Sequence, residues 1–380
     1  MGTHITLDLG DLNVHWGKNE YWFDHSPLFQ ARDVNKYVDK WTGEHGNEES
    51  AEKEVYERKL RDVVPRLELL GYNIESLQRD FDGLEADEGK TGSFKKISNV
   101  FRRMSSSNAP SRYFNNEVGS VDPWIILRLL ALNKANLDIP LKWNFYDWVE
   151  SGYGDRDRVV HDLRDTERFL LLTEGKSDAD ILRKAFDLLR PDIADFFRFA
   201  DMENHPFKGV GGLHDFCRGL VSIGNSNFTL AIYDNDTVGM AKMSETVKLT
   251  LPKNMRVMKL PNMKEFRRFS TLGTNGEQKE NINDKAVAIE CFLDLKWQDV
   301  DEPQVRWTVF DEKVGKYQGA LNRKNEYAQR FLGLRTKESG YSFDKLETLL
   351  DVIIGECVAI AGGSRRHQSA CDYAATRSSS

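Results

Sequence analysis

Cysteine is scarce in this sequence, and its spacing gives no sign of a metal-binding or disulfide framework. The four cysteines are Cys217, Cys291, Cys357 and Cys371, and no two of them form a CxxC pair. This argues against a zinc ribbon and against a small domain held together by disulfides. We therefore expect a protein of the reducing cytoplasm.

Long apolar runs are missing as well. No run approaches the roughly 20 residues that a membrane helix needs. The segment MGTHITLDLG at residues 1–10 lacks the basic and apolar blocks of a signal peptide. Gly2 and Thr6 fit the loose myristoylation pattern, but the start of a strand explains the same residues. We expect no membrane partner.

The sequence also lacks an excess of positive charge. Its formal net charge is −7 over 380 residues, so it is not a generally basic nucleic-acid coat. A nucleic-acid enzyme of this charge needs local basic patches and metal ions to hold phosphates. The length itself allows more than one domain with a substantial core.

The first part of the chain predicts an α+β domain at residues 1–162. Alternating apolar residues over 3–30 indicate β structure, and a polar loop is expected at 42–49. From Ser50 the apolar residues recur at helical spacing until Gly71, a C-terminal cap. Pro65 would kink or split this helix.

The later segments of the same part are more varied. A second helix is expected at 74–81, and the polar stretch 87–111 is either a solvated connection or a nucleic-acid contact. Asp122 and Pro123 open a helix as N-cap and first residue. An aromatic cluster follows, with core packing or base stacking as its alternatives, and consists of Trp143, Phe145, Tyr146 and Trp148. The highly charged stretch 152–168 marks the domain boundary.

Residues 163–362 have the pattern of an α/β domain. Strands predicted at 169–173, 196–200, 228–233 and 255–260 alternate with helices predicted at 178–189, 213–223 and 237–249. This order indicates a compact Rossmann-like unit with a mostly parallel sheet flanked by helices. The remaining segments are a polar insertion at 264–283, an apolar run at 286–295, a short strand and a basic helical piece within 303–332, a helix at 343–360, and a disordered tail at 363–380.

Acidic residues follow two of the predicted strands. Glu174 follows the first strand, and Asp234 and Asp236 follow the strand at 228–233. Ligands bind beyond the carboxyl ends of strands in parallel sheets, and carboxylates suit Mg²⁺ or Mn²⁺. The alternative is that the Asp-Asn-Asp-Thr segment supplies only turn and N-cap chemistry.

The combined pattern resembles the Toprim domain of primases, topoisomerases, OLD-family nucleases and RecR-type proteins. That domain has a strand ending in Glu-Gly-x-x-Asp, a glycine-rich loop before a helix, and a strand ending in Asp-x-Asp. The matching residues are Glu174, Gly175 and Asp178, then Gly209, Gly211 and Gly212, and finally Asp234 and Asp236.

The resemblance implies a role for each of these residues. Glu174 would be a metal ligand or the general acid/base, and Asp178 would assist catalysis. Asp234 and Asp236 would coordinate one or two Mg²⁺ or Mn²⁺ ions. Gly211 and Gly212 would allow nucleic acid to approach the backbone closely.

A second segment resembles the Ile-Glu-x-Tyr/Phe-Leu run of OLD-like nucleases. In residues 289–293 the glutamate is Glu290, which would help to hold a second metal; the alternative is an exposed helix carboxylate. Lys316, Arg323 and Lys324 follow it and would stabilise transition-state charge or grip the nucleic-acid backbone. The alternative for each is an ordinary surface charge.

A leading strand segment at residues 1–10, a helical middle and a Toprim core ending in the segment 289–293 together resemble the HEPN/Toprim-associated proteins over most of the chain. These are bacterial proteins connected with phage defence. Arg156 and His161 fit the Arg-x(4–6)-His pattern of HEPN ribonucleases, but such pairs arise by chance in charged segments. A HEPN active site is therefore not expected.

The predicted function is that of a metal-dependent nuclease acting on DNA or RNA, with a role in anti-phage defence. The alternatives are a non-catalytic Toprim module that binds nucleic acid or organises an assembly, and a sensor or toxin subunit activated by a partner. Expected partners are nucleic acid, further copies of the chain or a defence-system protein.

Overall fold

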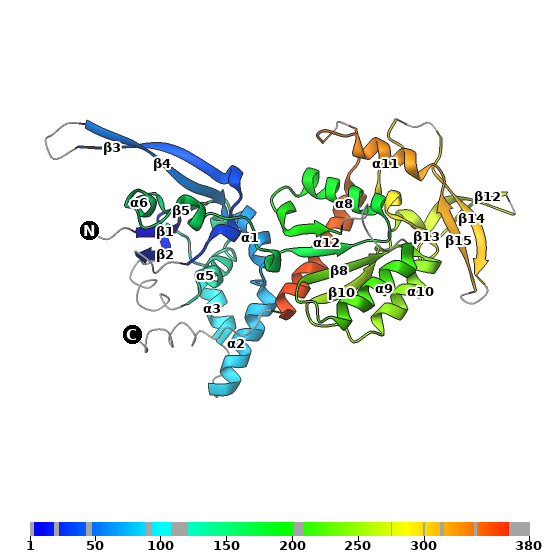
Figure 1. Ribbon diagram of the computed structural model, residues 1–380, viewed down its shortest axis with the longest axis horizontal. Coiled ribbons are helices and arrows are strands. Elements are labelled where there is room, and N and C mark those ends of the chain that lie inside the picture. Colours follow the sequence, from blue (N-terminus) through cyan, green and yellow to red (C-terminus); the bar gives the residue numbers. More distant parts are fainter. Residues whose placement is uncertain are drawn as a thin grey trace. The chain divides into compact units, whose positions relative to one another are not determined.

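A computed structural model describes residues 4–18, 23–42, 48–88, 93–107, 121–200, 209–274, 276–298, 301–311, 315–337 and 340–364. The chain divides into two compact units, Met1–Leu163 with Gly362–Ser380, and Arg164–Ala361 (Figure 1). The sequence predicted domain boundaries after residues 162 and 362. That the segments between these boundaries are independent domains stays a prediction. None of the helices in the described ranges has the length and apolar character needed to cross a membrane.

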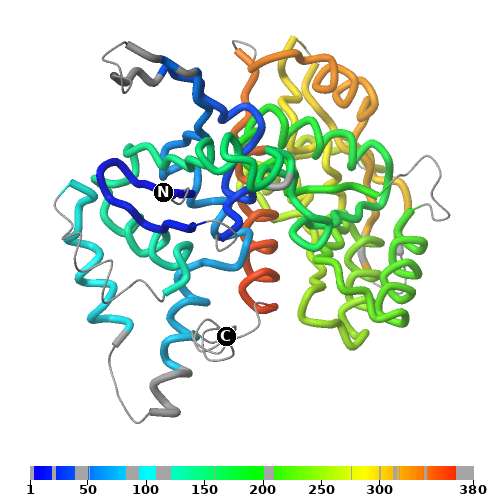
Figure 2. Tube along the Cα trace, turned by 60° about the vertical axis from the view of Figure 1, so that its left-hand side comes forward, coloured from blue at the N-terminus to red at the C-terminus, as the bar shows by residue number. Residues whose placement is uncertain are grey.

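The N-terminal unit contains a five-stranded antiparallel sheet in the order β2-β1-β5-β4-β3. Its strands are β1 (His4–Leu9), β2 (Leu12–Lys18), β3 (Val34–Thr42), β4 (Glu48–Lys59) and β5 (Pro140–Asn144). The predicted β structure near the N-terminus is confirmed by the hairpin of β1 and β2, which Figure 2 traces in dark blue.

The predicted helix from Ser50 is wrong in its first half. Residues 48–59 form β4, which pairs with β3 from Thr42↔Glu48 to Val34↔Tyr56. The helix α1 is Leu60–Leu69 and keeps Pro65 within it. Gly71 follows with a positive φ of 93°, as a C-terminal cap requires. Residues 48–59 pair with β3 instead of forming a helix. Their apolar residues continue the spacing of α1 because the end of β4 and the start of α1 pack into the same core.

Five further α-helices lie in the described part of this unit. They are α2 (Ile74–Glu88), α3 (Ser93–Phe101), α5 (Pro123–Leu130), α6 (Tyr146–Glu150) and α7 (Arg156–Val159). The side chain of Asp122 accepts a hydrogen bond from the Trp124 amide, which confirms the predicted N-cap. Helix α3 corrects the expectation of a solvated connection over 87–111, of which residues 89–92 and 108–111 lie outside the described residues.

The aromatic cluster of this unit belongs to its core. Trp143, Phe145 and Trp148 are buried among the apolar residues of β1, β4 and the helices. Trp143 stacks on Phe29 with ring centroids 5.9 Å apart. The packing alternative is therefore confirmed for these three rings, and they are not available for base stacking.

The C-terminal unit is built on a parallel four-stranded sheet in the order β10-β8-β6-β7. Its strands are β6 (Phe169–Leu172), β7 (Phe197–Phe199), β8 (Phe228–Tyr233) and β10 (Met255–Lys259). Helices α8 (Lys176–Leu189), α9 (Gly209–Ser222) and α10 (Thr237–Val247) connect them. Figure 1 shows α8 on one side of the sheet and α9 and α10 on the other. The predicted parallel α/β sheet flanked by helices is confirmed.

A second sheet follows in the chain and replaces two of the expected features. The polar insertion at 264–283 contains β11 (Phe269–Gly273) and β12 (Gly276–Glu280), which form a hairpin. The basic segment expected to be helical begins as a strand, β15 (Lys316–Leu321), and becomes helix α11 only at Lys324–Leu332. Strand β14 (Gln304–Asp311) completes the order β12-β11-β14-β15.

The last described element is helix α12 (Asp344–Ser364). Gly363 and Ser364, expected to begin a disordered tail, are still helical. Residues 365–380 lie outside the described residues.

Candidate metal centre

The carboxyl ends of β6 and β8 lie next to each other, with Leu172 paired to Ala231. Glu174 comes two residues after β6, and Asp234 directly follows β8. The Asp234 amide donates a hydrogen bond of 3.0 Å to Oε1 of Glu174, which ties the two strand ends together. This is the topological switch point of the sheet, because β6 leads to α8 on one face and β8 to α10 on the other. Such crevices are the usual ligand sites of open α/β sheets.

Two more carboxylates approach this edge from other elements. Asp178 lies in the first turn of α8, and its Oδ2 accepts a 2.9 Å hydrogen bond from the Gly175 amide. Glu290 lies on the 3₁₀ helix Ile289–Phe292, where Ser177 Oγ donates to its Oε1 over 3.4 Å. Glu290 is only 2% exposed, so its interpretation as an exposed helix carboxylate is wrong.

Burial and mutual repulsion raise the pKa values of the innermost carboxyl groups. The pKa of Asp234 lies well above its usual range, because of burial first and then the charges of Asp178, Glu174, Asp236 and Glu290. Burial is also the main cause that raises the pKa of Glu174 to about 7, with Asp236 and Asp178 contributing. These side chains therefore lie in one common field of negative charge.

The pKa of Asp178 is likewise raised to about 7, by burial and then by the charge of Glu290. The hydrogen bond from the Gly175 amide and the ammonium of Lys324 oppose this rise. Lys324 is an exposed residue at the start of α11, so it brings positive charge to the carboxylate edge from the solvent side.

Asp236 serves as the N-cap of α10, as the turn-and-cap alternative anticipated. Its Oδ1 accepts a 2.7 Å hydrogen bond from the Gly239 amide, and its Oδ2 accepts one of 2.5 Å from Gln318 Nε2. A carboxylate oxygen has two lone pairs, so each oxygen can still bind a cation. The N-cap role and a metal-binding role are therefore compatible.

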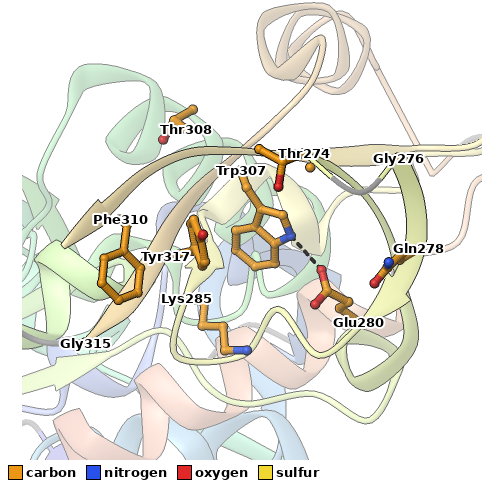
Figure 3. A pocket seen from close by; sticks show the side chains of 11 residues that line it. Thr274, Gly276, Gln278, Glu280, Lys285, Trp307, Thr308, Phe310, Gly315 and Tyr317 are labelled. Carbon is orange, nitrogen blue, oxygen red and sulfur yellow. Dashed lines mark hydrogen bonds between the residues drawn. The ribbon is translucent and has the colours of Figure 1, made fainter. Parts of the chain in front are cut away.

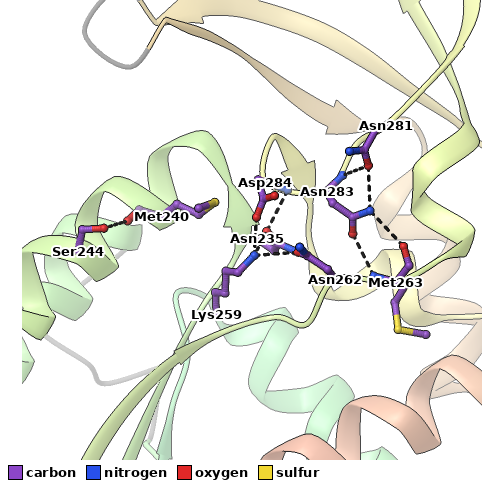
Figure 4. A network of polar contacts seen from close by, with 9 residues as sticks. All are labelled: Asn235, Met240, Ser244, Lys259, Asn262, Met263, Asn281, Asn283 and Asp284. Atoms are coloured by element: carbon purple, nitrogen blue, oxygen red, sulfur yellow. Dashed lines mark hydrogen bonds and ion pairs between the residues drawn. The ribbon is translucent and has the colours of Figure 1, made fainter.

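A polar network holds the residue between the two aspartates. Asn235 is fully buried, and its side chain contacts Lys259 Nζ at 2.9 Å and Asn262 Oδ1 at 2.6 Å (Figure 4). Lys259 also forms a 2.5 Å ion pair with Asp284, whose amide donates to Asn235 Oδ1. Lys259 and Asp284 were not predicted from the sequence, because the network joins segments about 25 and 50 residues from Asn235, a separation at which spacing patterns carry no signal.

The glycine that lets the backbone lie close to the acidic residues is Gly239, not Gly211 or Gly212 as the sequence predicted. Gly209–Gly212 form the first turn of α9, not a loop, and a Cβ on Gly211 would meet no atom within 4 Å. A Cβ on Gly239 would lie 2.5 Å from the Asp234 carbonyl oxygen and 3.0 Å from Glu174 Oε1. Gly239 is therefore the residue that permits the dense packing of the acidic edge.

The other predicted basic residues have different surroundings. Arg323 forms ion pairs with Glu326 at 2.7 Å and Asp301 at 3.4 Å, so its charge is shared with acidic neighbours. Lys316 is the first residue of β15. The nucleic-acid and catalytic roles of both stay predictions.

The two residues of the HEPN-like pattern have separate partners. Arg156 contacts Glu54 and the Tyr56 hydroxyl, at 3.0 and 2.9 Å. His161 Nε2 lies 2.7 Å from Asp24 Oδ2. These contacts account for the positions of both side chains, and the absence of a HEPN active site stays a prediction.

Comparison with known families bears on the N-terminal unit. Residues 1–88 and 82–167 match the family model of HEPN/Toprim N-terminal domain 1. This match supports the resemblance of the chain to the HEPN/Toprim-associated family. The match ends before β6 and leaves the carboxylate edge outside it. No curated protein and no solved structure matches the chain.

The donor chemistry of the carboxylate edge fits a hard divalent cation. In the ranges that the structure describes, no three His, Cys, Asp or Glu side chains form a ready-made metal-binding group. Magnesium, however, typically takes only one or two carboxylates and completes its shell with water and phosphate oxygens. Buried carboxyl groups that repel one another would also be relieved by a cation. Glu174, Asp234 and Asp236 are the residues that would hold it if the sequence prediction is right.

The pH dependence of stability tests the raised pKa values. Folding raises the pKa of Glu174 from 4.5 to about 7 and that of Asp178 from 3.8 to about 7. Between these limits the folded state binds more protons than the unfolded state, so the free energy of unfolding falls as the pH rises. The slope reaches at most about 1.4 kcal/mol per pH unit for each such proton. Urea unfolding in chelator from pH 5 to 8 measures it.

The Glu174→Gln variant lacks one of these titrating protons. Its free energy of unfolding should therefore fall less steeply with rising pH than that of the wild type. Asp215→Asn changes an acidic side chain of α9 that is 63% exposed and serves as the matched control. Equal slopes in the wild type and in Glu174→Gln would contradict the assignment of a raised pKa to Glu174.

Alanine substitution of two helical glycines tests the packing of the edge. Gly239→Ala forces a Cβ against Asp234 and Glu174 and should destabilise the protein by about 1–3 kcal/mol, the usual cost of overpacking. Gly211→Ala adds a Cβ in open space and should be neutral or stabilise by up to about 1 kcal/mol. Urea unfolding of both variants measures the difference; equal stabilities would show that Gly239 has no special packing role.

Proposed function

We propose that this chain is a divalent-metal-dependent nuclease with a Toprim-like, OLD-like catalytic core that hydrolyses phosphodiester bonds of DNA or RNA. The observation that carries the proposal is the meeting of Glu174 and Asp234 at adjacent strand ends, within the field of Asp178 and Glu290. Repulsion among buried carboxylates has no structural benefit of its own. Perturbed carboxyl groups of this kind, gathered at a crevice, are typical of functional sites.

The residues fall into two groups in this proposal. Glu174, Asp234 and Asp236 hold Mg²⁺ or Mn²⁺, and Glu290 helps to hold a second ion. The bound metal supplies charge neutralisation and polarisation of the phosphodiester. The Asp234 amide fixes one oxygen of Glu174, so the orientation of this ligand does not depend on solvent.

Asp178 is the candidate proton carrier. With its pKa raised to about 7, it can accept or release a proton near neutral pH. The Gly175 amide keeps its carboxylate in place at the start of α8. The exposed ammonium of Lys324 nearby offers a contact for a phosphate oxygen and stabilises negative charge as the bond breaks.

The N-terminal domain match adds context to this proposal. Its description names HEPN and Toprim proteins. The proposed role in bacterial anti-phage defence rests on the resemblance of the sequence to HEPN/Toprim-associated proteins. A second candidate is a non-catalytic nucleic-acid-binding module, in which Asp236 serves only as the N-cap of α10 and as the partner of Gln318.

Cleavage assays distinguish the two functions. Purified protein is incubated with plasmid DNA, single-stranded DNA and tRNA, each with Mg²⁺, Mn²⁺ or chelator. We expect metal-dependent cleavage by the wild type and by the control Asp215→Asn. In Glu174→Gln and Asp234→Asn the rate should fall at least about a hundredfold, the scale for removing one group that stabilises a transition state.

Cleavage by Asp234→Asn at the wild-type rate, or cleavage in chelator, would refute the carboxylate mechanism. Binding of nucleic acid without any cleavage would favour the module instead.

A further inference from the structure

A pocket outside the carboxylate edge lies on the sheet β12-β11-β14-β15. It is a cavity of about 420 Å³, lined by Trp307, Phe310 and Tyr317 together with Glu280 and Lys285 (Figure 3). The proposed nuclease mechanism uses none of these five residues. Aromatic side chains around an open cavity on a sheet surface are typical of a binding site for a flat ligand.

The three aromatic rings form a continuous wall. Tyr317 lies between the other two, with ring centroids 4.9 Å from Phe310 and 6.3 Å from Trp307. Phe310 is 47% exposed and Tyr317 is 50% exposed, although both are large aromatic residues. Exposed rings that pack against one another present their faces to a ligand and lose little conformational entropy when it binds.

Polar groups fix the wall and give the pocket a chemical preference. Oε2 of Glu280 accepts hydrogen bonds from Trp307 Nε1 at 2.6 Å and from Thr271 Oγ1 at 2.8 Å, which sets the plane of the indole. Among the described residues, Oε1 of Glu280 has no hydrogen-bond partner. It is therefore available to accept from an N–H group of a ligand.

Lys285 makes the Trp307 face of the pocket less suitable for a cationic ligand. Its Nζ lies 5.8 Å from the centre of the Trp307 ring, so the face of the indole already has a positive charge near it. A second cation would be repelled. The combination of aromatic faces, one acceptor and one ammonium fits a neutral, flat, nitrogen-containing ring with N–H donors, followed by a phosphate.

Strand β15 joins this pocket to the carboxylate edge. Tyr317 and Gln318 are consecutive, so their side chains point to opposite faces of the strand. Gln318 donates to Asp236 on one face, and the Tyr317 ring lines the pocket on the other. The Tyr317 carbonyl accepts a hydrogen bond from Thr237, and Lys285 forms a backbone bridge with Asp236.

We propose that the aromatic pocket binds an unpaired nucleobase of a single-stranded nucleic acid, on the face of β15 opposite to the one that contacts the carboxylate edge. The base stacks on the ring of Tyr317 and packs against Phe310, whose ring plane lies at 63° to that of Tyr317, and Glu280 accepts from one of its N–H groups. Lys285 contacts a neighbouring phosphate. This inference rests on the proposed nuclease function for the phosphodiester, and it adds a preference for unpaired substrate, because a base within a duplex cannot enter the pocket.

Equilibrium binding in chelator tests the pocket without requiring cleavage. The probe is a short single-stranded DNA oligonucleotide, and the variants are Tyr317→Ala and Phe310→Ala. Val309→Ala is the matched control, because Val309 neighbours Phe310 on β14, is 63% exposed and does not line the pocket. Each ring removal should weaken binding about tenfold, in the range for loss of one base-stacking contact, and the control should bind like the wild type.

A second probe identifies the base as the occupant. In an oligonucleotide with a fluorescent 2-aminopurine at successive positions, stacking should quench the fluorescence at one position, and Tyr317→Ala should restore it. Replacing that base by an abasic site should abolish the affinity difference between the wild type and Tyr317→Ala. Tyr317→Phe keeps the ring and should bind like the wild type.

The inference is overturned if the ring variants bind the oligonucleotide as tightly as the wild type or if the wild type does not bind it. Tyr317-dependent binding of a trimethyl-lysine peptide in place of the oligonucleotide would also overturn it. Failure of the proposed nuclease function gives a different result, namely ring-dependent binding in chelator but no cleavage with any metal.

Discussion

Repulsion among carboxyl groups at the ends of two neighbouring parallel strands is the constraint on which the rest of this structure depends. Asp234 and Glu174 are linked through a backbone amide, and burial keeps water from screening their charges. Such an arrangement is destabilising at neutral pH unless the groups hold protons or a cation is present. The nearby elements can be understood as the framework that holds these groups in place nonetheless.

That framework consists of contacts from distant parts of the chain. Lys259, at the end of β10, and Asp284 fix Asn235 between the two aspartates. Gly239 lets helix α10 begin directly against the strand ends, and its amide caps onto Asp236. Gln318 then links Asp236 to the second sheet. The same strand, β15, carries Tyr317, so the acidic edge and the aromatic pocket are positioned by one element.

The sequence predicted the parts of the fold that depend on local patterns. Residues 169–172 and 228–233 are apolar because a parallel sheet covered on both faces buries them, and they were predicted as strands. The acidic residues after them were found because strand ends are visible as abrupt changes of polarity. Residues 48–59 were misassigned, because the apolar spacing that continues from Tyr56 into α1 is the same for a strand followed by a helix as for one long helix.

The site was predictable only where its residues follow a strand in the chain. Glu290 was found through a resemblance, but its burial depends on packing between distant segments that no spacing rule describes. Gly239 and Lys259 were missed for the same reason. The glycines at 209–212 were expected to form a loop because Gly is unfavourable within helices, yet they lie at the first turn of α9, where that cost is smaller and few contacts limit the backbone.

Calorimetric titration of Mn²⁺ into the purified protein tests the central claim most directly, because it asks whether the carboxylate edge binds a divalent cation at all. The account predicts saturable binding to the wild type and to Asp215→Asn, and affinity reduced at least about tenfold in Asp234→Asn, since a buried ligand is lost. Circular dichroism confirms that the variant is folded. Equal Mn²⁺ affinity in folded Asp234→Asn and wild type, or no Mn²⁺ binding by either, would contradict the account.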